Sequence, residues 1–150
     1  FGLGAGAAPG TPWSREHDLL GIPLADSMRR RHDRVVEVLD LCDVLWDPRR
    51  ADEWTGFPLP SPRPPVLLGV NSVALAKVAG LRCDAVNVRL DHPAIAELFQ
   101  AGSDARAESA VKTRLELTAW APMSNASLDR DGDAQRRVDD VGGDRLILVS

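Results

Sequence analysis

The chain has 150 residues, 44% of them hydrophobic and 27% charged, so it carries enough apolar mass for one core of ordinary size and is not expected to be disordered. Its net charge of −4 provides no general attraction to nucleic acid or to anionic lipid, and we expect neither as a partner. The longest apolar runs are far shorter than the roughly 20 residues that cross a bilayer, and no segment has the pattern of a signal peptide.

The first six residues, FGLGAG, are typical of a core strand, and neither a methionine nor a targeting segment nor a disordered tail precedes them. We therefore expect the chain to be a fragment of a longer protein. The two cysteines, Cys42 and Cys83, indicate reduced buried thiols rather than a disulfide framework. Reduced thiols favour a cytoplasmic location.

A long helix is predicted after the loop that contains Glu16 and His17. Asp26 or Ser27 can cap its first turn, and Pro48 ends it. Apolar side chains recur at helical spacing at five positions, which we expect to pack on a sheet: Met28, Val35, Leu39, Cys42 and Trp46. The MRRRHDR run at 28–34 is similar to a nucleic-acid-binding patch, but the acidic residues that follow favour a solvated helix face of mixed charge.

The rest of the chain alternates between strand and helix patterns. Residues 47–65 hold six prolines and no periodicity, so they predict a surface loop inserted before the next strand. The further strands are predicted at residues 66–70, 85–89, 114–121 and 145–149. The further helices are predicted from Ser72 to a left-handed cap at Gly80, from His92 and Pro93 to a stop at Gly102, and over Ala134, Val138 and Val141 ahead of Gly142. Connections of this length favour parallel strands with right-handed crossovers, so the predicted fold class is α/β.

The glycines at the start allow two interpretations. Residues 2–7 match the G-x-G-x-x-G/A fingerprint of an NAD(P)-binding Rossmann domain. A helix should open directly after that fingerprint, whereas Pro9, Gly10 and Pro12 oppose one. Alternatively, Gly4 and Gly6 lie at the carboxyl end of a parallel strand, either where a flat ring or a substrate meets the backbone or where a neighbouring strand packs tightly.

Four motifs in this order resemble the luciferase-like monooxygenase superfamily. They are FGLGAG, the arginine-rich helix that ends in VLDLCDVLWDP, the segment PPVLLGVNSVALAKVAGLRCDAVNV and the closing VGGDRLILVS. The resemblance covers most of the chain, apart from the proline-rich loop and residues 101–113. It implies a partial (β/α)8 TIM barrel: such barrels have eight strands in about 250 residues, so the first three strand-helix units would lie upstream of Phe1.

The resemblance also implies a function. Members of the superfamily are oxidoreductases that use the deazaflavin F420 or FMN for hydride transfer to, or oxygenation of, a small organic substrate. The arginine- and alanine-rich composition suggests a GC-rich bacterial genome. Such bacteria are expected to use deazaflavins, so F420 is placed narrowly ahead of FMN. Similar enzymes hold the cofactor phosphate on the loop corresponding to Gly69, Val70, Asn71 and Ser72, and the ring over Gly4, Ala5 and Gly6. Amides at a helix start suit a phosphate, although Ser72 also has the simpler role of a helix cap.

Four more residues are candidates for the site. Asn87 is expected within its strand, near the cofactor. Arg89 is expected to begin the following loop, where it would meet an anionic cofactor tail or pair with a surface carboxylate. Glu16 and His17 are candidate acid, base or substrate contacts, or simply polar loop residues. Related deazaflavin enzymes sometimes have an acidic residue directly after the glycine-rich strand, where this chain has Ala7.

Two alternatives to the oxidoreductase remain open at this point. One is a non-catalytic fragment or binding module that lacks a complete cofactor site, and the other is the Rossmann domain. We see no metal-binding spacing and no serine-histidine-acid set, and a homo-oligomer is compatible with the pattern.

Overall fold

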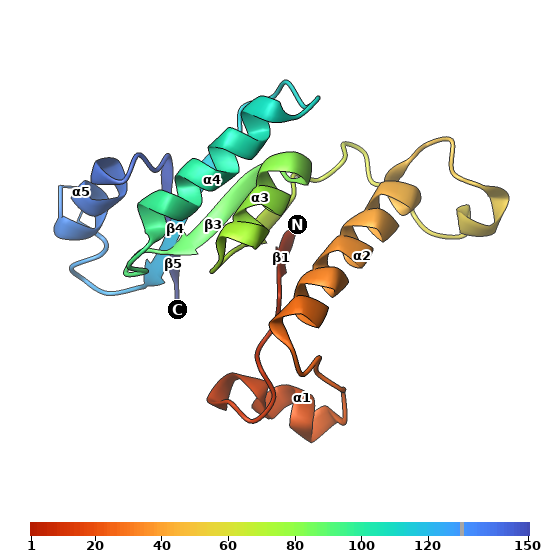
Figure 1. Cartoon of the computed structure of the whole chain (residues 1–150), viewed down its shortest axis with the longest axis horizontal. Coiled ribbons are helices and arrows are strands. Elements are labelled where there is room, and N and C mark those ends of the chain that lie inside the picture. Colours follow the sequence, from red (N-terminus) through yellow and green to blue (C-terminus); the bar gives the residue numbers. More distant parts are fainter. Residues whose placement is uncertain (130) are drawn as a thin grey trace. The chain divides into compact units, whose positions relative to one another are not determined.

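A computed structural model describes residues 1–129 and 131–150. The chain divides into two compact units, which we describe separately: residues 1–3 with 65–150, and residues 4–64. The first unit contains the sheet and three helices, and the second contains two α-helices (Figure 1).

The sheet has five strands: β1 (Gly2–Gly4), β2 (Leu67–Gly69), β3 (Ala85–Arg89), β4 (Glu116–Pro122) and β5 (Arg145–Val149). All are parallel, and their spatial order is their order in the chain. The helices α3 (Val73–Arg82), α4 (Ile95–Glu108) and α5 (Asp133–Asp140) connect β2 to β3, β3 to β4 and β4 to β5. The predicted α/β class with parallel strands is therefore confirmed, and the arrangement is compatible with part of a barrel.

Alternate residues of the central strands face opposite sides of the sheet. Leu68, Val86 and Ala119 are completely buried and share one face of the sheet, since Leu68 pairs with Val86, and Ala119 pairs with Val88 two residues further along β3. The α3 and α4 helices pack on β3 at the middle of the sheet (Figure 1). The opposite face carries polar side chains, including Asn87 and its neighbour Thr118.

Two glycines that were predicted to end helices lie inside them instead. Gly80 belongs to α3 and Gly102 belongs to α4, and both predictions of a helix stop are wrong. A Cβ on Gly80 would collide with the carbonyl oxygen of Gly102 and would lie 2.8 Å from the Cβ of Ala105. Because the two helix backbones approach so closely here, the small residues serve packing between helices, and neither glycine has a positive φ.

The end of α5 agrees with the sequence. Gly142 has a φ of +72°, and its amide donates to Asp139 while the next amide donates to Val138. Val138 is completely buried. The left-handed glycine thus turns the chain from α5 into β5, while the side chain of Val138 keeps the helix anchored in the core.

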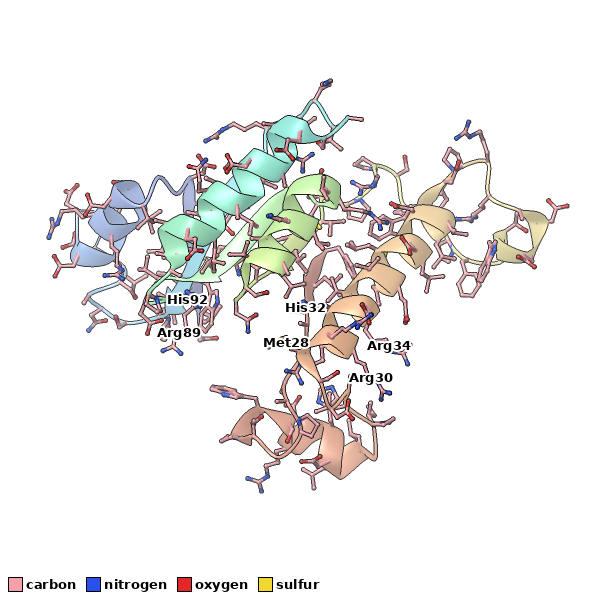
Figure 2. The ribbon with its side chains drawn as sticks, viewed as in Figure 1. Met28, Arg30, His32, Arg34, Arg89 and His92 are labelled. Carbon is pink, nitrogen blue, oxygen red and sulfur yellow. The ribbon has the colours of Figure 1, made fainter. Side chains whose placement is uncertain are left out.

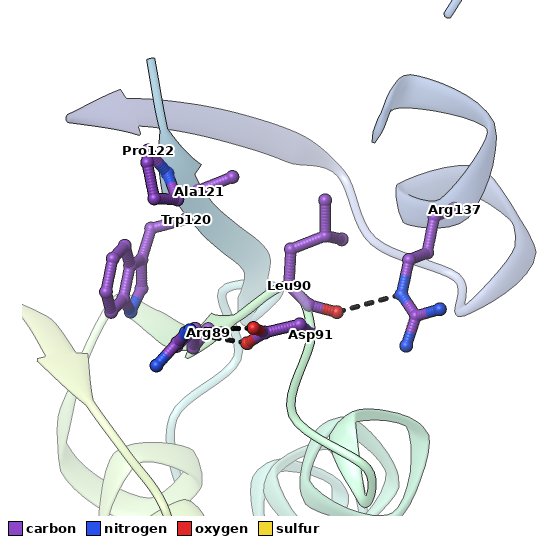
Figure 3. A pocket seen from close by; sticks show the side chains of 7 residues that line it. All are labelled: Arg89, Leu90, Asp91, Trp120, Ala121, Pro122 and Arg137. Carbon is purple, nitrogen blue, oxygen red and sulfur yellow. Dashed lines mark hydrogen bonds and ion pairs between the residues drawn. The ribbon is translucent and has the colours of Figure 1, made fainter. Parts of the chain in front are cut away.

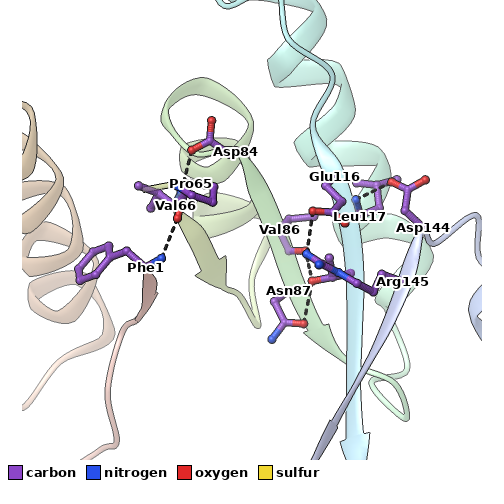
Figure 4. Close-up of polar contacts among 11 residues, drawn as sticks. Phe1, Pro65, Val66, Asp84, Val86, Asn87, Glu116, Leu117, Asp144 and Arg145 are labelled. Carbon is purple, nitrogen blue, oxygen red and sulfur yellow. Dashed lines mark hydrogen bonds and ion pairs between the residues drawn. The ribbon is translucent and has the colours of Figure 1, made fainter. Parts of the chain in front are cut away.

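Two aspartates bind neighbouring strands at the amino edge of the sheet (Figure 4). Directly before β3, the carboxylate of Asp84 accepts the amide of Val66 at 2.7 Å, while its own amide donates to the Val66 carbonyl at 2.8 Å. Directly before β5, the carboxylate of Asp144 accepts the amide of Leu117 at 2.8 Å, while its own amide donates to the Leu117 carbonyl at 2.6 Å. Each aspartate therefore closes a reciprocal pair of hydrogen bonds with the strand beside it.

The second unit is dominated by α2 (Met28–Trp46). As predicted, Ser27 caps it by accepting the amide of Arg30 at 3.3 Å, and it ends before Pro48. Along the predicted stripe Val35 is buried, whereas Met28 is 42% exposed. Arg30 and Arg34 are among the labelled side chains of this helix in Figure 2, and each forms an exposed ion pair, Arg30 with Asp26 and Arg34 with Glu37. Such pairs are typical of a solvated face of mixed charge.

The start of this unit differs from the prediction. Glu16 and His17 lie in a short helix, α1 (Arg15–Leu20), which follows the 3-10 turn η1 (Pro12–Ser14), rather than in a loop. Pro12 suits a first helical position, and Gly21 ends α1 with a φ of +64°. The proline-rich segment after α2 contains only the 3-10 turn η2 (Asp52–Trp54) as regular structure.

Candidate functional site

The carboxyl edge of the sheet is where a parallel α/β fold places its binding loops. In the first unit β2 ends at Gly69, β3 at Arg89 and β4 at Pro122. The predicted residues Gly69, Asn87 and Arg89 therefore come together at one edge of one sheet.

The loop from Gly69 to Ser72 leads directly into α3. The amide of Val70 donates to the carbonyl of Asn87 at 2.9 Å, which joins the loop to β3. Ser72 accepts the amide of Leu75 at 3.4 Å, so its role as a helix cap is confirmed. Asn71 is exposed. The amides of Val73 and Ala74 are in the first turn, where a helix has no internal acceptor for them, so they are available to an anion.

Asn87 is held on the polar face of the sheet. It pairs in register with Gly69 on one side and with Thr118 on the other. The hydroxyl of Thr118 lies 2.9 Å from the side-chain oxygen of Asn87 and 2.9 Å from the Val86 carbonyl. When the hydroxyl donates to Asn87, the amide nitrogen of that side chain remains as a donor beside Gly69.

Arg89 is the last residue of β3 rather than the start of the loop, so this prediction is wrong by one residue. Its guanidinium binds both carboxylate oxygens of Asp91, at 2.6 Å from Nε and 2.7 Å from Nη2. The same group lies 5.8 Å from the ring centre of Trp120, its partner in the register with β4. Arg89 thus faces β4, and an aspartate already compensates its charge.

A pocket of about 230 Å³ opens beside Arg89 (Figure 3). Its lining comes from the ends of β3 and β4 and from α5: Arg89, Leu90, Asp91, Trp120, Ala121, Pro122 and Arg137. The Nε of Arg137 donates to the carbonyl of Leu90 at 2.9 Å. Neither Trp120 nor Arg137 was predicted as a site residue from the sequence. Trp120 could have been found from the sequence, because it lies close to the end of a predicted strand that follows the strand of Arg89.

The division between the units falls within β1, so that its last residue, Gly4, belongs to the second unit. That unit also contains Ala5, Gly6, Glu16 and His17. A Cβ on Gly4 would meet no atom of the described residues within 4 Å, so packing does not require a glycine there. Gly6 has a φ of +69°, a conformation that favours glycine. Glu16 is exposed, and the Nδ1 of His17 is buried without a hydrogen-bond partner in the described part of the chain.

Within residues 1–129 and 131–150, no three histidine, cysteine, aspartate or glutamate side chains lie together as metal ligands would. None of the helices in the same residues has the length and apolar character needed to cross a membrane.

No family model matches this sequence, and the comparison with curated proteins gives no match.

Proposed function

We propose that the chain is part of an oxidoreductase of the luciferase-like type that binds F420 or FMN at the carboxyl edge of its sheet and acts on a small organic substrate. One observation carries the proposal: five parallel strands follow one another in chain order, and a helix start and polar side chains meet at their carboxyl edge. In a (β/α)8 barrel each strand is likewise the neighbour of the next, and the site lies at this edge.

The residues at this edge fit the phosphate of such a cofactor. The first-turn amides of α3 and the favourable end of its dipole would face an anion placed beside Asn71. A Cβ on Gly69 would lie 3.6 Å from the carbonyl oxygen of Leu3, an ordinary contact, so packing of β1 on β2 does not demand a glycine there. The missing side chain is consistent with a site that a ligand approaches closely.

Asn87 is positioned to orient the ring. Its side chain is fixed by Thr118, and its amide nitrogen can donate to a carbonyl or ring nitrogen of the cofactor. When bound, such a cofactor supplies hydride transfer or activation of oxygen, and the protein supplies binding and orientation. Gly4, Ala5 and Gly6 remain proposed contacts of the ring. Glu16 and His17 remain proposed contacts of the substrate.

The Rossmann alternative receives less support. The six-stranded dinucleotide-binding fold reverses its strand order about the first strand, and the cofactor binds at that reversal. The five strands here show no reversal, and residues 9–11, after the glycines, form a turn rather than a helix.

A cofactor titration tests the proposal. The protein with any upstream units is titrated with FMN and with F420 while cofactor fluorescence is followed. We expect a saturable change in fluorescence with one of the two cofactors, and we expect that cofactor to be F420 rather than FMN. No saturable change with either cofactor would remove the proposal and leave the non-catalytic binding module as the better interpretation.

A further inference from the structure

The pocket between the ends of β3 and β4 and α5 has a composition that selects one class of ligand. Two arginines and one aspartate line it, so it carries one net positive charge. The remaining lining is apolar or aromatic: Leu90, Trp120, Ala121 and Pro122. A monoanion with a flat apolar body matches this combination better than an inorganic dianion does.

The two arginines are in different states. Arg89 is paired with both oxygens of Asp91, so its charge is largely compensated. Arg137 uses Nε to bind the Leu90 carbonyl, and neither Nη atom has a hydrogen-bond partner among the described residues. The fixed Nε orients the planar guanidinium, which leaves two parallel donors for the two oxygens of a carboxylate.

The aromatic wall lies at the other side of the pocket. In Figure 3, Leu90 is placed between Arg137 and the pair formed by Arg89 and Trp120. The indole of Trp120 is half-buried and held by the guanidinium of Arg89. A ring whose carboxylate is on Arg137 would therefore extend over Leu90 toward the indole, where aromatic contacts are favourable.

We propose that this pocket binds a small aromatic monocarboxylate, with Arg137 holding the carboxylate and Leu90 and Trp120 contacting the ring. The inference goes beyond the proposed function, because it requires neither FMN nor F420. The volume of the pocket agrees with this proposal. At about 230 Å³ it is smaller than the roughly 300 to 1,000 Å³ of pockets that bind drug-sized ligands. A single small ring therefore fits the pocket better than a whole cofactor does.

The test is a calorimetric or NMR titration of the full chain with benzoate, without any cofactor. Benzamide has the ring without the charge, acetate has the charge without the ring, and phenyl phosphate is a dianion with the ring. We expect saturable binding of benzoate, and binding about tenfold weaker or worse for the other three. No saturable binding of benzoate, or tighter binding of phenyl phosphate, would overturn the proposal.

Matched variants locate the binding. Arg137→Gln should weaken benzoate binding about tenfold. Arg136→Gln should leave it unchanged, because Arg136 directly precedes Arg137 in α5 but pairs with Asp133 outside the pocket. Asp91→Asn should strengthen benzoate binding, because it frees the charge of Arg89. Circular dichroism checks that each variant is folded; if Arg137→Gln does not fold, Arg137→Lys replaces it and should still bind benzoate more weakly. Equal affinities for the Arg136 and Arg137 variants would contradict the assignment.

Discussion

Gly80 of α3 lies against the backbone of Gly102 of α4, so closely that no side chain fits between them. We predict that Gly80→Ala destabilises the protein by up to about 2 kcal/mol, because overpacking costs up to about 3 kcal/mol and alanine recovers about 1 kcal/mol of helix propensity. Urea denaturation followed by circular dichroism measures this. The control is Gly2→Ala, where the new Cβ meets no described atom within 4 Å. An equal shift in both variants would contradict the packing argument.

The aspartate before β3 offers a second test of stability. Asp84→Ala leaves the buried start of β2 without the acceptor of the Val66 amide, and we expect a loss of about 1 to 3 kcal/mol in the free energy of unfolding. Asp104→Ala removes an exposed carboxylate on α4 and should change stability by less than about 0.5 kcal/mol. Urea midpoints that fall equally in the two variants would show that the contact with Val66 is not the cause.

Cysteine reactivity tests the environment of α2. Burial, together with the neighbouring carboxylate of Asp43, raises the pKa of the Cys42 thiol. Since the thiolate is the reactive form, Asp43→Asn should lower this pKa and speed labelling by a disulfide reagent at pH 8 about twofold. Asp33→Asn, an exposed change on the same helix, serves as the control. Cys83 is 1% exposed and should react only after unfolding.

The turn after α2 should show its own pH dependence. The backbone amide of Arg49, and next its side chain, hold the pKa of Asp47 below its ordinary value of 3.8. A depressed pKa in the folded state means that this carboxylate contributes stability above pH 3.8, which is lost as the pH falls through the lowered pKa. Because the backbone amide remains in Arg49→Ala, an NMR titration of that variant should show only part of the shift lost. Complete return to 3.8 would make the side chain the main cause.

The proposed phosphate contact can be tested by charge. Asn71→Asp places a carboxylate beside the start of α3, where it favours the helix dipole but repels a phosphate. We therefore expect cofactor affinity to fall about tenfold while the urea midpoint does not fall. Asn125→Asp makes the same charge change in the loop after β4 and should affect the cofactor much less. Unchanged affinity in Asn71→Asp would place the phosphate elsewhere.

Structural features that depend on a few neighbouring residues were predicted correctly from the sequence alone. Two strands were predicted with the observed bounds, residues 85–89 and 145–149, because short apolar runs between turn signals define them. Ser27 was one of two predicted caps, with Asp26, and Ser72 was also predicted as a cap, while the last helix was predicted to end ahead of Gly142; each of these depends on a few neighbouring residues. Gly80 and Gly102 were wrongly predicted to end helices, because their positions inside helices are explained only by the close packing of α3 against α4.

The sequence by itself determined the alternation of strands and helices and the polar residues at the strand ends, and hence the edge of the sheet at which we propose a site. Only the tertiary structure decided that Arg89, Trp120 and Arg137 share one pocket and that Asp84 binds the start of β2. The physical reason is that these contacts depend on which residues of parallel strands pair, and this register is set by crossovers that bring together residues from 18 to 48 positions apart.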